Sequence, residues 1–546
     1  MRKLSLGWIF FALIGVFCLV IAHDYGISYD EPIRWSGGDR KLGYYAHLFG
    51  FTDNPDAMQV RRDLYPGFFD LNLAWVRKLS PASDWGTGRV FNLFFGLLGV
   101  VATGLLAQQI RKGAGWWAGA FLLLYPGWFG HMFINPKDIP FATMYTFSLA
   151  ALLHFLKKDD GRFLSRPLLL FSVVAGLTAA TRVPGLIFFV YLAMVMVAGL
   201  LLRAEKDPGG PAIPPLSAWL REAGRGLLAV GIGFAVLLPW WPYLHSNPFG
   251  HTAAAIGSVT HFEWEFPVFF WGEYIPAQDL PFSYLPTWFL FTTPLALMVA
   301  ALLGGFFALK TLRTMPTDNL RENIRENLPV IVGLFAIIFP VVFILVLNST
   351  LYNGLRHVLF IIAPGIALIA AGWTAWWQKG WPSLKPLNAR LAAGALLLAY
   401  APVLATMVRL HPYQYTYFNE LAGGVGNASH QFETEYWGTS YREGIGLLVD
   451  WLDAHNAEGD VIVNMEHPTW LVRHFIPRDR PYRIHLVRSQ GEPAHFFIAN
   501  TVWHTHTWWA GEVIATVERE GAVFCVVRDR RHLVGEQRAM FYGFED

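Results

Sequence analysis

The chain has 546 residues, of which 54% are hydrophobic and 15% are charged, and its formal net charge is +2. A soluble domain typically has about 25% charged residues, so this composition excludes an ordinary soluble enzyme and indicates a polytopic membrane protein. The sequence contains no basic run of the kind that binds nucleic acid, which excludes that class of partner. Because its two cysteines, Cys18 and Cys525, lie far apart, we expect neither a disulfide framework nor a thiolate metal site.

Eleven apolar stretches approach the length that a helix needs to cross a bilayer, which is roughly 20 residues. The first stretch follows Arg2 and Lys3 as a signal peptide would, but it ends at His-Asp-Tyr rather than at a small-residue cleavage site. We therefore interpret it as a membrane anchor. The predicted spans are residues 4–22, 88–109, 114–132, 139–156, 167–181, 184–202, 225–244, 286–309, 328–347, 357–376 and 391–408.

The distribution of charge predicts how these spans are oriented. Every connecting segment that the eleven-span count assigns to the cytoplasm carries lysine or arginine, whereas the short outer loops carry one cation each. This asymmetry is the one that the positive-inside rule requires. The alternative is a single broken span over 167–203, which would place the C-terminal tail in the cytoplasm. Pro184 disfavours helix at the residue before it, so the sequence favours a hairpin at Arg182.

The predicted orientation divides the chain into two domains. Residues 1–410 form a transmembrane domain with outer loops 23–87 and 245–285, and residues 411–546 form a soluble extracytoplasmic domain. The aromatic and acidic residues of 245–285 predict a segment that lies along the membrane surface. In the tail, one amphipathic helical pattern and several short β-branched runs predict a small α/β domain. The helix is expected at 441–455 and the strands at 461–463, 495–499, 513–517 and 523–527.

Two adjacent carboxylates, Asp30 and Glu31, follow the first predicted span. Acidic side chains at a membrane are costly, so they usually have a partner or a function. The structural interpretation is a carboxylate at a helix N-terminus or an ion-pair partner for Arg34. The functional interpretation is a general base, because a carboxylate can take the proton of an acceptor hydroxyl as a new bond forms. Asp70 is either a second acid in the same cavity or an exposed carboxylate at a helix start.

Cations in three other outer loops are candidate ligands for an anion. Lys137 would meet an anionic ligand while Asp138 orients a neighbour, although the two can also form a plain pair within their loop. Arg356, in Leu-Tyr-Asn-Gly-Leu-Arg-His, opens an outer helix end. A guanidinium there can bind a phosphate through two hydrogen bonds, or it can simply extend to the membrane interface. Arg182 occupies a similar position at its predicted hairpin.

The opening of the tail and a candidate metal site each allow more than one interpretation. The opening of the tail, including the run Glu435–Gly438, combines aromatic residues with acids and amides, as do both sugar-binding surfaces and surfaces that pack onto a membrane face. A divalent metal is a candidate cofactor. His504 and His506 alternate as on a strand, but two histidines fall short of the ligand number of an established zinc site. A second candidate set is His261, Glu263 and Glu265.

Together these motifs resemble the GT-C membrane glycosyltransferases, in particular glycosyltransferase family 39, which includes the protein O-mannosyltransferases and the lipid A aminoarabinose transferase. The resemblance covers most of the membrane region. The basic cluster familiar from the aminoarabinose transferase is not apparent around Asp70. The motifs that carry the resemblance are Asp30-Glu31 after the first span, the acidic and aromatic segment ending at Asp70, Asn135-Pro-Lys-Asp-Ile-Pro-Phe, Tyr284-Leu-Pro-Thr-Trp with Thr292-Thr-Pro, and Gly354-Leu-Arg-His.

The resemblance implies a GT-C fold and an enzyme of the inner membrane. Such an enzyme moves a hexosyl or pentosyl group from a polyprenyl-phosphate carrier to a hydroxyl of a glycan, lipid or protein acceptor, with inversion at the sugar carbon. Asp30 would be the catalytic base, assisted by Glu31. The donor phosphate would be bound by Arg356, Lys137 and Arg182, and the substrates would be contacted by Asp70, Asp138, Tyr352 and His357.

Two other classes of protein remain as alternatives. A transporter or flippase of a lipid-linked sugar would often show paired repeats and charged residues at mid-membrane. This sequence shows no such repeat, and its acids cluster at outer loops, which favours an enzyme. A non-catalytic assembly protein that binds partners through its tail predicts instead that Asp30 is replaceable.

Overall fold

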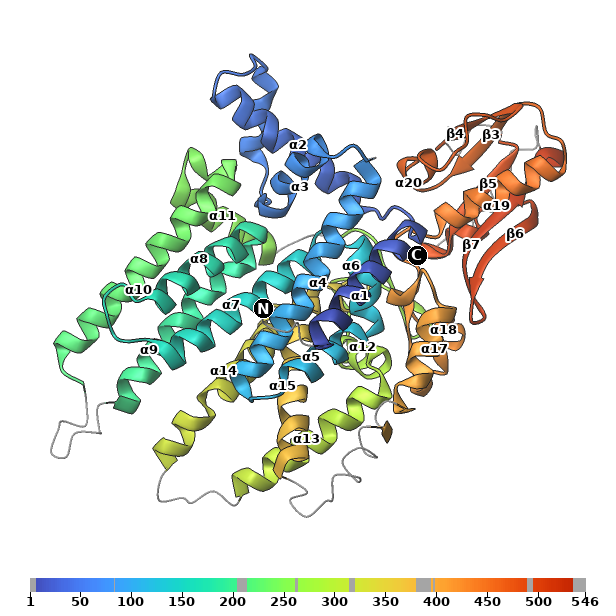
Figure 1. Cartoon of the computed structure of the whole chain (residues 1–546). Coiled ribbons are helices and arrows are strands. Elements are labelled where there is room, and N and C mark those ends of the chain that lie inside the picture. Colours follow the sequence, from blue (N-terminus) through green and yellow to red (C-terminus); the bar gives the residue numbers. More distant parts are fainter. Residues whose placement is uncertain are drawn as a thin grey trace.

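The computed structural model describes residues 6–82, 84–203, 214–260, 264–313, 320–379, 394–395, 398–488 and 494–533 (Figure 1). Helices form most of it, and six of the described helices are long and apolar enough to cross a membrane. The chain is therefore an integral membrane protein, as its composition predicts. The six helices are α4 (Asp84–Ile110), α7 (Asp138–Lys158), α9 (Ile187–Arg203), α10 (Leu216–Leu237), α14 (Leu320–Val346) and α15 (Leu359–Lys379).

Prolines break two of the predicted spans. In both cases the residue before the proline is extended, with ψ of 104° at Tyr125 and 127° at Thr293, because the proline ring disfavours a helical conformation there. If the second pair, which meets at 106°, is counted as one span, seven helices qualify, so the described residues do not establish the count of eleven. The pairs are α5 (Gly115–Leu123) with α6 (Pro126–Ile134), and α12 (Tyr284–Thr292) with α13 (Leu295–Arg313).

Shorter helices occupy three other predicted spans. They are α1 (Leu6–Ile21), α8 (Arg166–Thr181) and α17 (Ala401–Arg409); most of the first half of the last span lies outside the described residues. Between α8 and α9, Arg182 is extended, with φ −154° and ψ 144°, and a 3-10 turn, η3 (Val183–Leu186), follows it. The structure thus breaks the chain at Arg182, where Pro184 predicts a break.

The predicted outer segments lie at one end of the helical bundle. Figure 1 shows α2 (Asp30–Leu48), α3 (Phe68–Leu79) and α11 (Pro248–Thr260) at the same end as the C-terminal sheet. The segment 245–285 also contains a hairpin that the sequence analysis missed, β1 (Val268–Phe270) and β2 (Glu273–Ile275). Its two turn residues, Trp271 and Gly272, have φ of 56° and 82°. Tryptophan is an unusual residue for such a turn, so the sequence carried no hairpin signal.

The C-terminal domain is a mixed five-stranded sheet with the strand order β4-β3-β5-β7-β6. β3 is parallel to β4 and β5, while β7 is antiparallel to β5 and β6. The predicted α/β domain is therefore confirmed, although the edge strand β4 was not among the predicted strands. The strands are β3 (Gly459–Met465), β4 (Tyr482–Val487), β5 (Phe496–Asn500), β6 (Glu512–Arg519) and β7 (Ala522–Asp529).

The helix α19 (Tyr441–Ala454) covers this sheet, as its periodicity predicts. Ile445, Leu448 and Leu452 recur at intervals of three and four residues, which places them on one face of the helix, and all three are buried. The opposite face of the helix is polar and faces solvent, so within the described chain no further apolar layer covers it.

The opening of the tail packs the C-terminal domain tightly onto the helical bundle. Its aromatic residues are buried, including Tyr415 and Trp437. Gly130 of α6 lies so close to this segment that an added Cβ would be 2.4 Å from the Tyr415 nitrogen. The Asn419 side chain donates hydrogen bonds to the carbonyls of Leu290 and Thr293, which the break after α12 leaves free. Of the two interpretations of this segment, the structure shows packing.

Candidate active site

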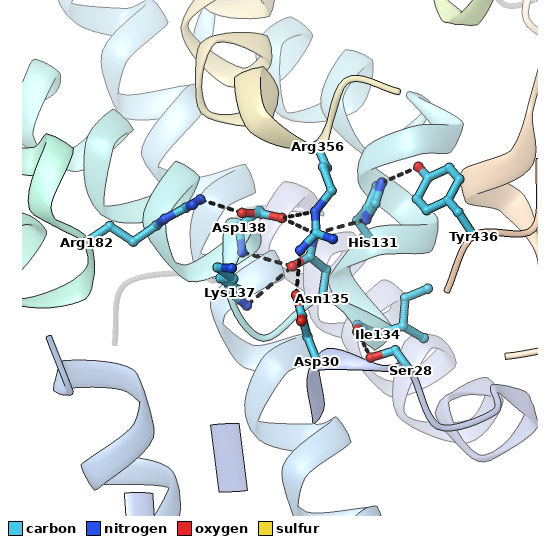
Figure 2. Close-up of polar contacts among 10 residues, drawn as sticks. All are labelled: Ser28, Asp30, His131, Ile134, Asn135, Lys137, Asp138, Arg182, Arg356 and Tyr436. Atoms are coloured by element: carbon cyan, nitrogen blue, oxygen red, sulfur yellow. Dashed lines mark hydrogen bonds and ion pairs between the residues drawn. The ribbon is translucent and has the colours of Figure 1, made fainter. Parts of the chain in front are cut away.

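Three segments that are far apart in the sequence meet at the end of the bundle that carries α2 and α3, and one arginine joins them. Arg356 lies just before α15, Asp30 opens α2 and Asp138 opens α7 (Figure 2). The Arg356 Nη2 atom is 2.5 Å from Asp30 Oδ2, and its Nε atom is 3.2 Å from Asp138 Oδ2. The guanidinium therefore bridges two carboxylates from different elements. All three residues are candidates predicted from the sequence.

A local turn holds Asp138 in place. The Asn135 Oδ1 atom accepts hydrogen bonds from the backbone nitrogens of Asp138, at 2.9 Å, and of Lys137, at 3.3 Å. Its Nδ2 atom donates to Asp138 Oδ2 at 3.0 Å. This is a turn that asparagine side chains commonly form, and it fixes the first residue of α7. A carboxylate at that position is also favoured by the helix dipole.

Two more cations surround the bridge. Arg182 Nη1 lies 2.5 Å from Asp138 Oδ1, and Lys137 Nζ lies 4.9 Å from the centre of the Tyr65 ring. Burial raises the pKa of Tyr65, but Lys137 and Arg182 lower it by more, so that it falls below its ordinary value. Lys137, Arg182 and Arg356 together outnumber the carboxylates Asp30 and Asp138, which leaves a surplus of positive charge. Such a surplus suits an anionic ligand.

The C-terminal tail completes the site. The Arg356 guanidinium lies 4.3 Å from the Trp437 ring centre, and Trp437 is fully buried. The Tyr436 hydroxyl lies 3.4 Å from His131 Nε2, and the backbone carbonyl of Trp437 accepts a hydrogen bond from the nitrogen of Tyr29 at 3.1 Å. These contacts were not predicted, because they join residues from different parts of the chain, between 81 and 408 positions apart. The only signal in the sequence was the aromatic run itself.

Tyr352 and His357 lie on another side of Arg356. The Tyr352 ring stacks on Trp264 at 3.8 Å and meets His357 edge-on at 4.4 Å, and the Arg356 guanidinium is 5.7 Å from its centre. Burial raises the pKa of Tyr352 to about 12, so its hydroxyl stays protonated. Both residues therefore lie beside Arg356, and their role in substrate binding stays a prediction.

Asp30 is the more accessible of the two bridged acids. Its side chain is 16% exposed, against 2% for Asp138. Burial raises the pKa of Asp30, but Arg356 and Lys137 lower it by more, so that the carboxyl group titrates below its usual range. Asp30 is consequently ionised at neutral pH and can accept a proton.

The structure does not bring Glu31 to this cluster. Its side chain is 2% exposed and pairs with Arg89 of α4 at 3.3 Å, and it accepts a hydrogen bond from the nitrogen of Ser28 at 2.7 Å. A glutamate that reaches back to the chain before its own helix is a common N-terminal capping arrangement. Burial raises the pKa of Glu31. Glu31 thus has the structural role of joining α2 to α4.

Asp70 lies outside the cluster, and the Arg34 side chain separates the two. It pairs with Arg34 at 3.3 Å and with Lys41 at 3.6 Å. Arg34 in turn lies 4.7 Å from the centre of the Tyr65 ring, on which Lys137 also rests. Asp70 therefore supports the wall of the site through Arg34.

Across the part of the chain that the structure describes, there is no group of three or more histidine, cysteine or acidic side chains that could hold a metal ion. His504 and His506 are neighbours, with ring centres 5.9 Å apart. His261 and Glu263 lie outside the described residues. The candidate metal thus has no assigned ligands.

The fold and the site define an integral membrane protein with a cationic, acid-containing site at one end of its helical bundle. Neither family models nor curated proteins gave a match to this sequence. Similar solved structures exist. ArnT from Cupriavidus metallidurans, bound to undecaprenyl phosphate, is 14% identical with a TM-score of 0.46, and the alignment covers 96% of this chain and 98% of that one.

Two structures of an oligosaccharyltransferase from Archaeoglobus fulgidus are also similar. The apo form is 13% identical with a TM-score of 0.42, covering 87% of this chain and 64% of that one. The second, AglB with an inhibitory peptide and a dolichol-phosphate, is 13% identical with a TM-score of 0.41, covering 91% and 70%. These proteins are membrane sugar transferases, the class that the sequence motifs resemble.

Proposed function

We propose that the chain is a membrane glycosyltransferase that moves a hexosyl or pentosyl group from a polyprenyl-phosphate carrier to an acceptor hydroxyl. The observation that carries this proposal is the bridge from Arg356 to Asp30 and Asp138, set among surplus cations at the outer end of the bundle. The cations suit a phosphate, and the more exposed carboxylate suits a base. One site therefore contains both a base that can activate the acceptor and cations that can stabilise the leaving group.

An apolar groove near this site fits the lipid part of such a donor. A cavity of about 380 Å³ lies between α12, α13, α14 and α15, and of the described residues that line it only Tyr125 and Thr293 carry a polar group. Ile362 and Ile369 of α15 line the groove. At a rise of 1.5 Å per residue they lie roughly 9 to 20 Å along the helix from Arg356. A phosphate bound at Arg356 would therefore leave its hydrocarbon chain beside this groove.

The reaction is a direct displacement at the sugar carbon. The acceptor oxygen attacks that carbon, its proton passes to the Asp30 carboxylate, and the bond from the carbon to the phosphate oxygen breaks. Polyprenyl phosphate leaves with the bonding electron pair. Arg356, Lys137 and Arg182 stabilise the negative charge that develops on it. Attack opposite the leaving group inverts the configuration of the carbon.

Donor binding would also activate Asp30. Arg356 holds Asp30 at 2.5 Å, and a donor phosphate would compete for the same guanidinium. As the phosphate takes over the Arg356 hydrogen bonds, the pKa of Asp30 would rise and the carboxylate would become a better base. The base is thus kept weak until the leaving group is in place.

The proposed location is the inner membrane, with the site and the C-terminal domain on the outer side. Basic connecting segments on the opposite side support this orientation. Nucleotide sugars are not supplied outside the cytoplasm, so a lipid carrier is the donor that such an orientation requires. Asp138, Tyr352 and His357 would then contact the sugar or its phosphate.

The test is transfer of radiolabelled sugar from membrane lipid carriers by the purified chain and by D30N. We expect D30N to lower the rate by about 10²- to 10⁴-fold, the usual contribution of a general base. Asp39 lies on the same helix and pairs with Arg77 near the surface, so D39N is the matched control and should retain full activity. A folded D30N variant with undiminished transfer would refute the assignment of the base.

A further inference from the structure

A second cavity lies between the β1–β2 hairpin and the C-terminal domain, outside the site described above. Its volume is about 240 Å³. The hairpin lines one side, and the segment before α19 together with the 3-10 segment η10 (Val502–Thr507) lines the other. The cavity thus forms where the membrane domain and the C-terminal domain meet. Residues that define it are Phe269, Tyr274, Glu433, Trp503, His504 and His506.

Two polar atoms of residues in its wall lack hydrogen-bond partners in the described structure. They are Glu433 Oε2 and His506 Nδ1, and both atoms are buried. The other carboxylate oxygen of Glu433 receives a long hydrogen bond, of 3.5 Å, from the nitrogen of Phe269, and the backbone nitrogen of Asn353 also interacts with this carboxyl group. Buried polar groups are nearly always satisfied in folded proteins. Unsatisfied groups at a cavity are therefore available to a ligand.

The backbone on the opposite wall is strained. Trp503 and His504 have φ of 49° and 55°, a left-handed conformation that bulky residues rarely adopt. The Trp503 side chain fixes this conformation, since its indole nitrogen donates to the carbonyl of Pro267 and its ring stacks on Phe266 at 4.3 Å. Strain of this kind persists where surrounding contacts impose it, and it clusters at binding sites.

The chemistry of the wall selects against an anion. No lysine or arginine is among the described residues that line the cavity. Burial lowers the pKa of His506 to about 4, and burial raises the pKa of Glu433 to about 7. At neutral pH the wall therefore offers the uncharged imidazole of His506, a partly ionised carboxyl group, the hydroxyls of Ser429 and Thr501, and aromatic rings. These groups match a neutral ligand that is rich in hydroxyls.

One short segment connects this cavity to the catalytic cluster. Glu433 and Glu435 line the cavity, whereas Tyr436 contacts His131 and Trp437 lies over Arg356. Fully extended, the four residue-to-residue steps from Glu433 to Trp437 span at most about 14 Å. A chain of a few sugar units bound in the cavity would therefore reach the cluster.

We propose that this cavity binds a neutral sugar unit of the acceptor and so selects a glycan, or a lipid that carries one, over a protein. This inference rests on the proposed transferase function. The ligand is held by hydrogen bonds to Glu433, His506 and the hydroxyls, and by contact of its apolar ring face with the aromatic residues. The C-terminal domain then recognises the acceptor.

The test is saturation-transfer NMR on the full chain in nanodiscs. The probes are the methyl glycosides of glucose, galactose, mannose and N-acetylglucosamine, with glucuronate as the charged comparison. We expect at least one neutral glycoside to bind and glucuronate not to bind. E433Q should weaken binding roughly tenfold, the effect of one hydrogen bond to a charged or polar group, and V523F, which fills the cavity from β7, should abolish it. E512Q, on the exposed side of β6, is the matched control.

Three results would overturn the inference: no neutral glycoside binds, glucuronate binds as well as the neutral probes, or V523F binds as well as the unchanged chain. Circular dichroism and gel filtration verify that the variants fold. In the transfer assay, E433Q and V523F should raise the KM for the acceptor without changing the KM for the donor. Binding of a glycoside without any transfer would refute the proposed function alone, whereas transfer with an unchanged acceptor KM in both variants would refute the acceptor site alone.

Discussion

Two arginines, at opposite ends of α7, each bridge two carboxylates. Arg356 joins Asp30 and Asp138 at the start of the helix, while Arg225 joins Asp159, just after its end, to Glu222 at 2.5 and 2.9 Å. The guanidinium and carboxylate geometry is nearly the same. The surroundings differ. Lys137 and Arg182 add positive charge beside Arg356, whereas one arginine between two carboxylates leaves the Arg225 bridge with a net negative charge.

Access to the two bridges is similar. Asp30 and Glu222 are each 16% exposed, whereas Asp138 and Asp159 are 2% and 4% exposed. A buried arginine and carboxylate pair is thus no sign of catalysis by itself, since many such pairs only join helices. The surplus positive charge distinguishes the Arg356 site. We interpret the Arg225 bridge as the structural counterpart that ties α10 to the end of α7.

The largest effect on stability is expected at the structural bridge. R225A leaves the Asp159 carboxylate buried without its partner, which should lower the free energy of unfolding by about 3 to 5 kcal/mol. Thermal unfolding in detergent measures this loss. Arg162 is 81% exposed and pairs with Asp160, so R162A is the control and should unfold as the unchanged chain does. Transfer by the folded fraction of R225A should be normal; a loss of catalysis there would erase the distinction between the two bridges.

The next largest effect is expected on catalysis at Arg356. R356K keeps the charge but cannot make two parallel hydrogen bonds to a phosphate or hold two carboxylates. Losing one such charged hydrogen bond costs about 1.5 to 3 kcal/mol, so kcat should fall roughly 10- to 150-fold. The matched control is R225K, whose kcat should stay within about twofold of that of the unchanged chain. Equal losses in the two variants would contradict the account.

A smaller effect is expected at Lys137. K137Q removes surplus charge but leaves the Arg356 bridge intact, so it should raise the KM for the lipid donor roughly tenfold, the effect of about 1.4 kcal/mol. The KM for the acceptor should not change. Lys112 is an exposed lysine in the segment after α4, and K112Q should leave both constants unchanged. An unchanged donor KM in K137Q would remove the surplus-charge argument.

The smallest effect is a difference between two pH profiles. The pKa of Asp30 is lowered in the free protein, so its charge is present at pH 5 to 8 and is lost only as the pH falls through that lowered value. The kcat/KM for the donor should therefore show no acid limb from Asp30 between pH 8 and 5. The kcat should show a limb at higher pH, because donor binding takes Arg356 away from Asp30. Identical limbs in both profiles would contradict donor-linked activation of the base.

The sequence predicted the residues at helix ends better than the residues between elements. Asp30, Lys137, Arg182 and Arg356 follow or precede apolar stretches on the predicted outer side, so span length and charge place them at the same depth. Residues at the same depth in the membrane can meet when the helices pack together, and these residues form one cluster. Glu31 was assigned to the same site because it is adjacent to Asp30, but successive helical residues point in different directions, and Arg89 holds Glu31 against α4.

What the sequence could not supply is long-range packing. Trp437 contacts Arg356 only because the tail folds back onto α6 and α12, and no local pattern encodes that docking. The prolines at 126 and 294 were visible, but hydropathy alone predicted continuous spans across them. The strained turn at Trp503 and His504 is likewise a consequence of contacts with the segment before β1.

The central claim is that the Arg356 site transfers a sugar and releases polyprenyl phosphate. The most direct test incubates the purified chain with a polyprenyl-phosphate sugar labelled differently in sugar and lipid, together with membrane acceptors, and counts both products. We predict one polyprenyl monophosphate released for each sugar that reaches an acceptor hydroxyl, with both products absent in D30N. A donor that crosses the bilayer with both labels still joined would contradict the account and identify a flippase instead.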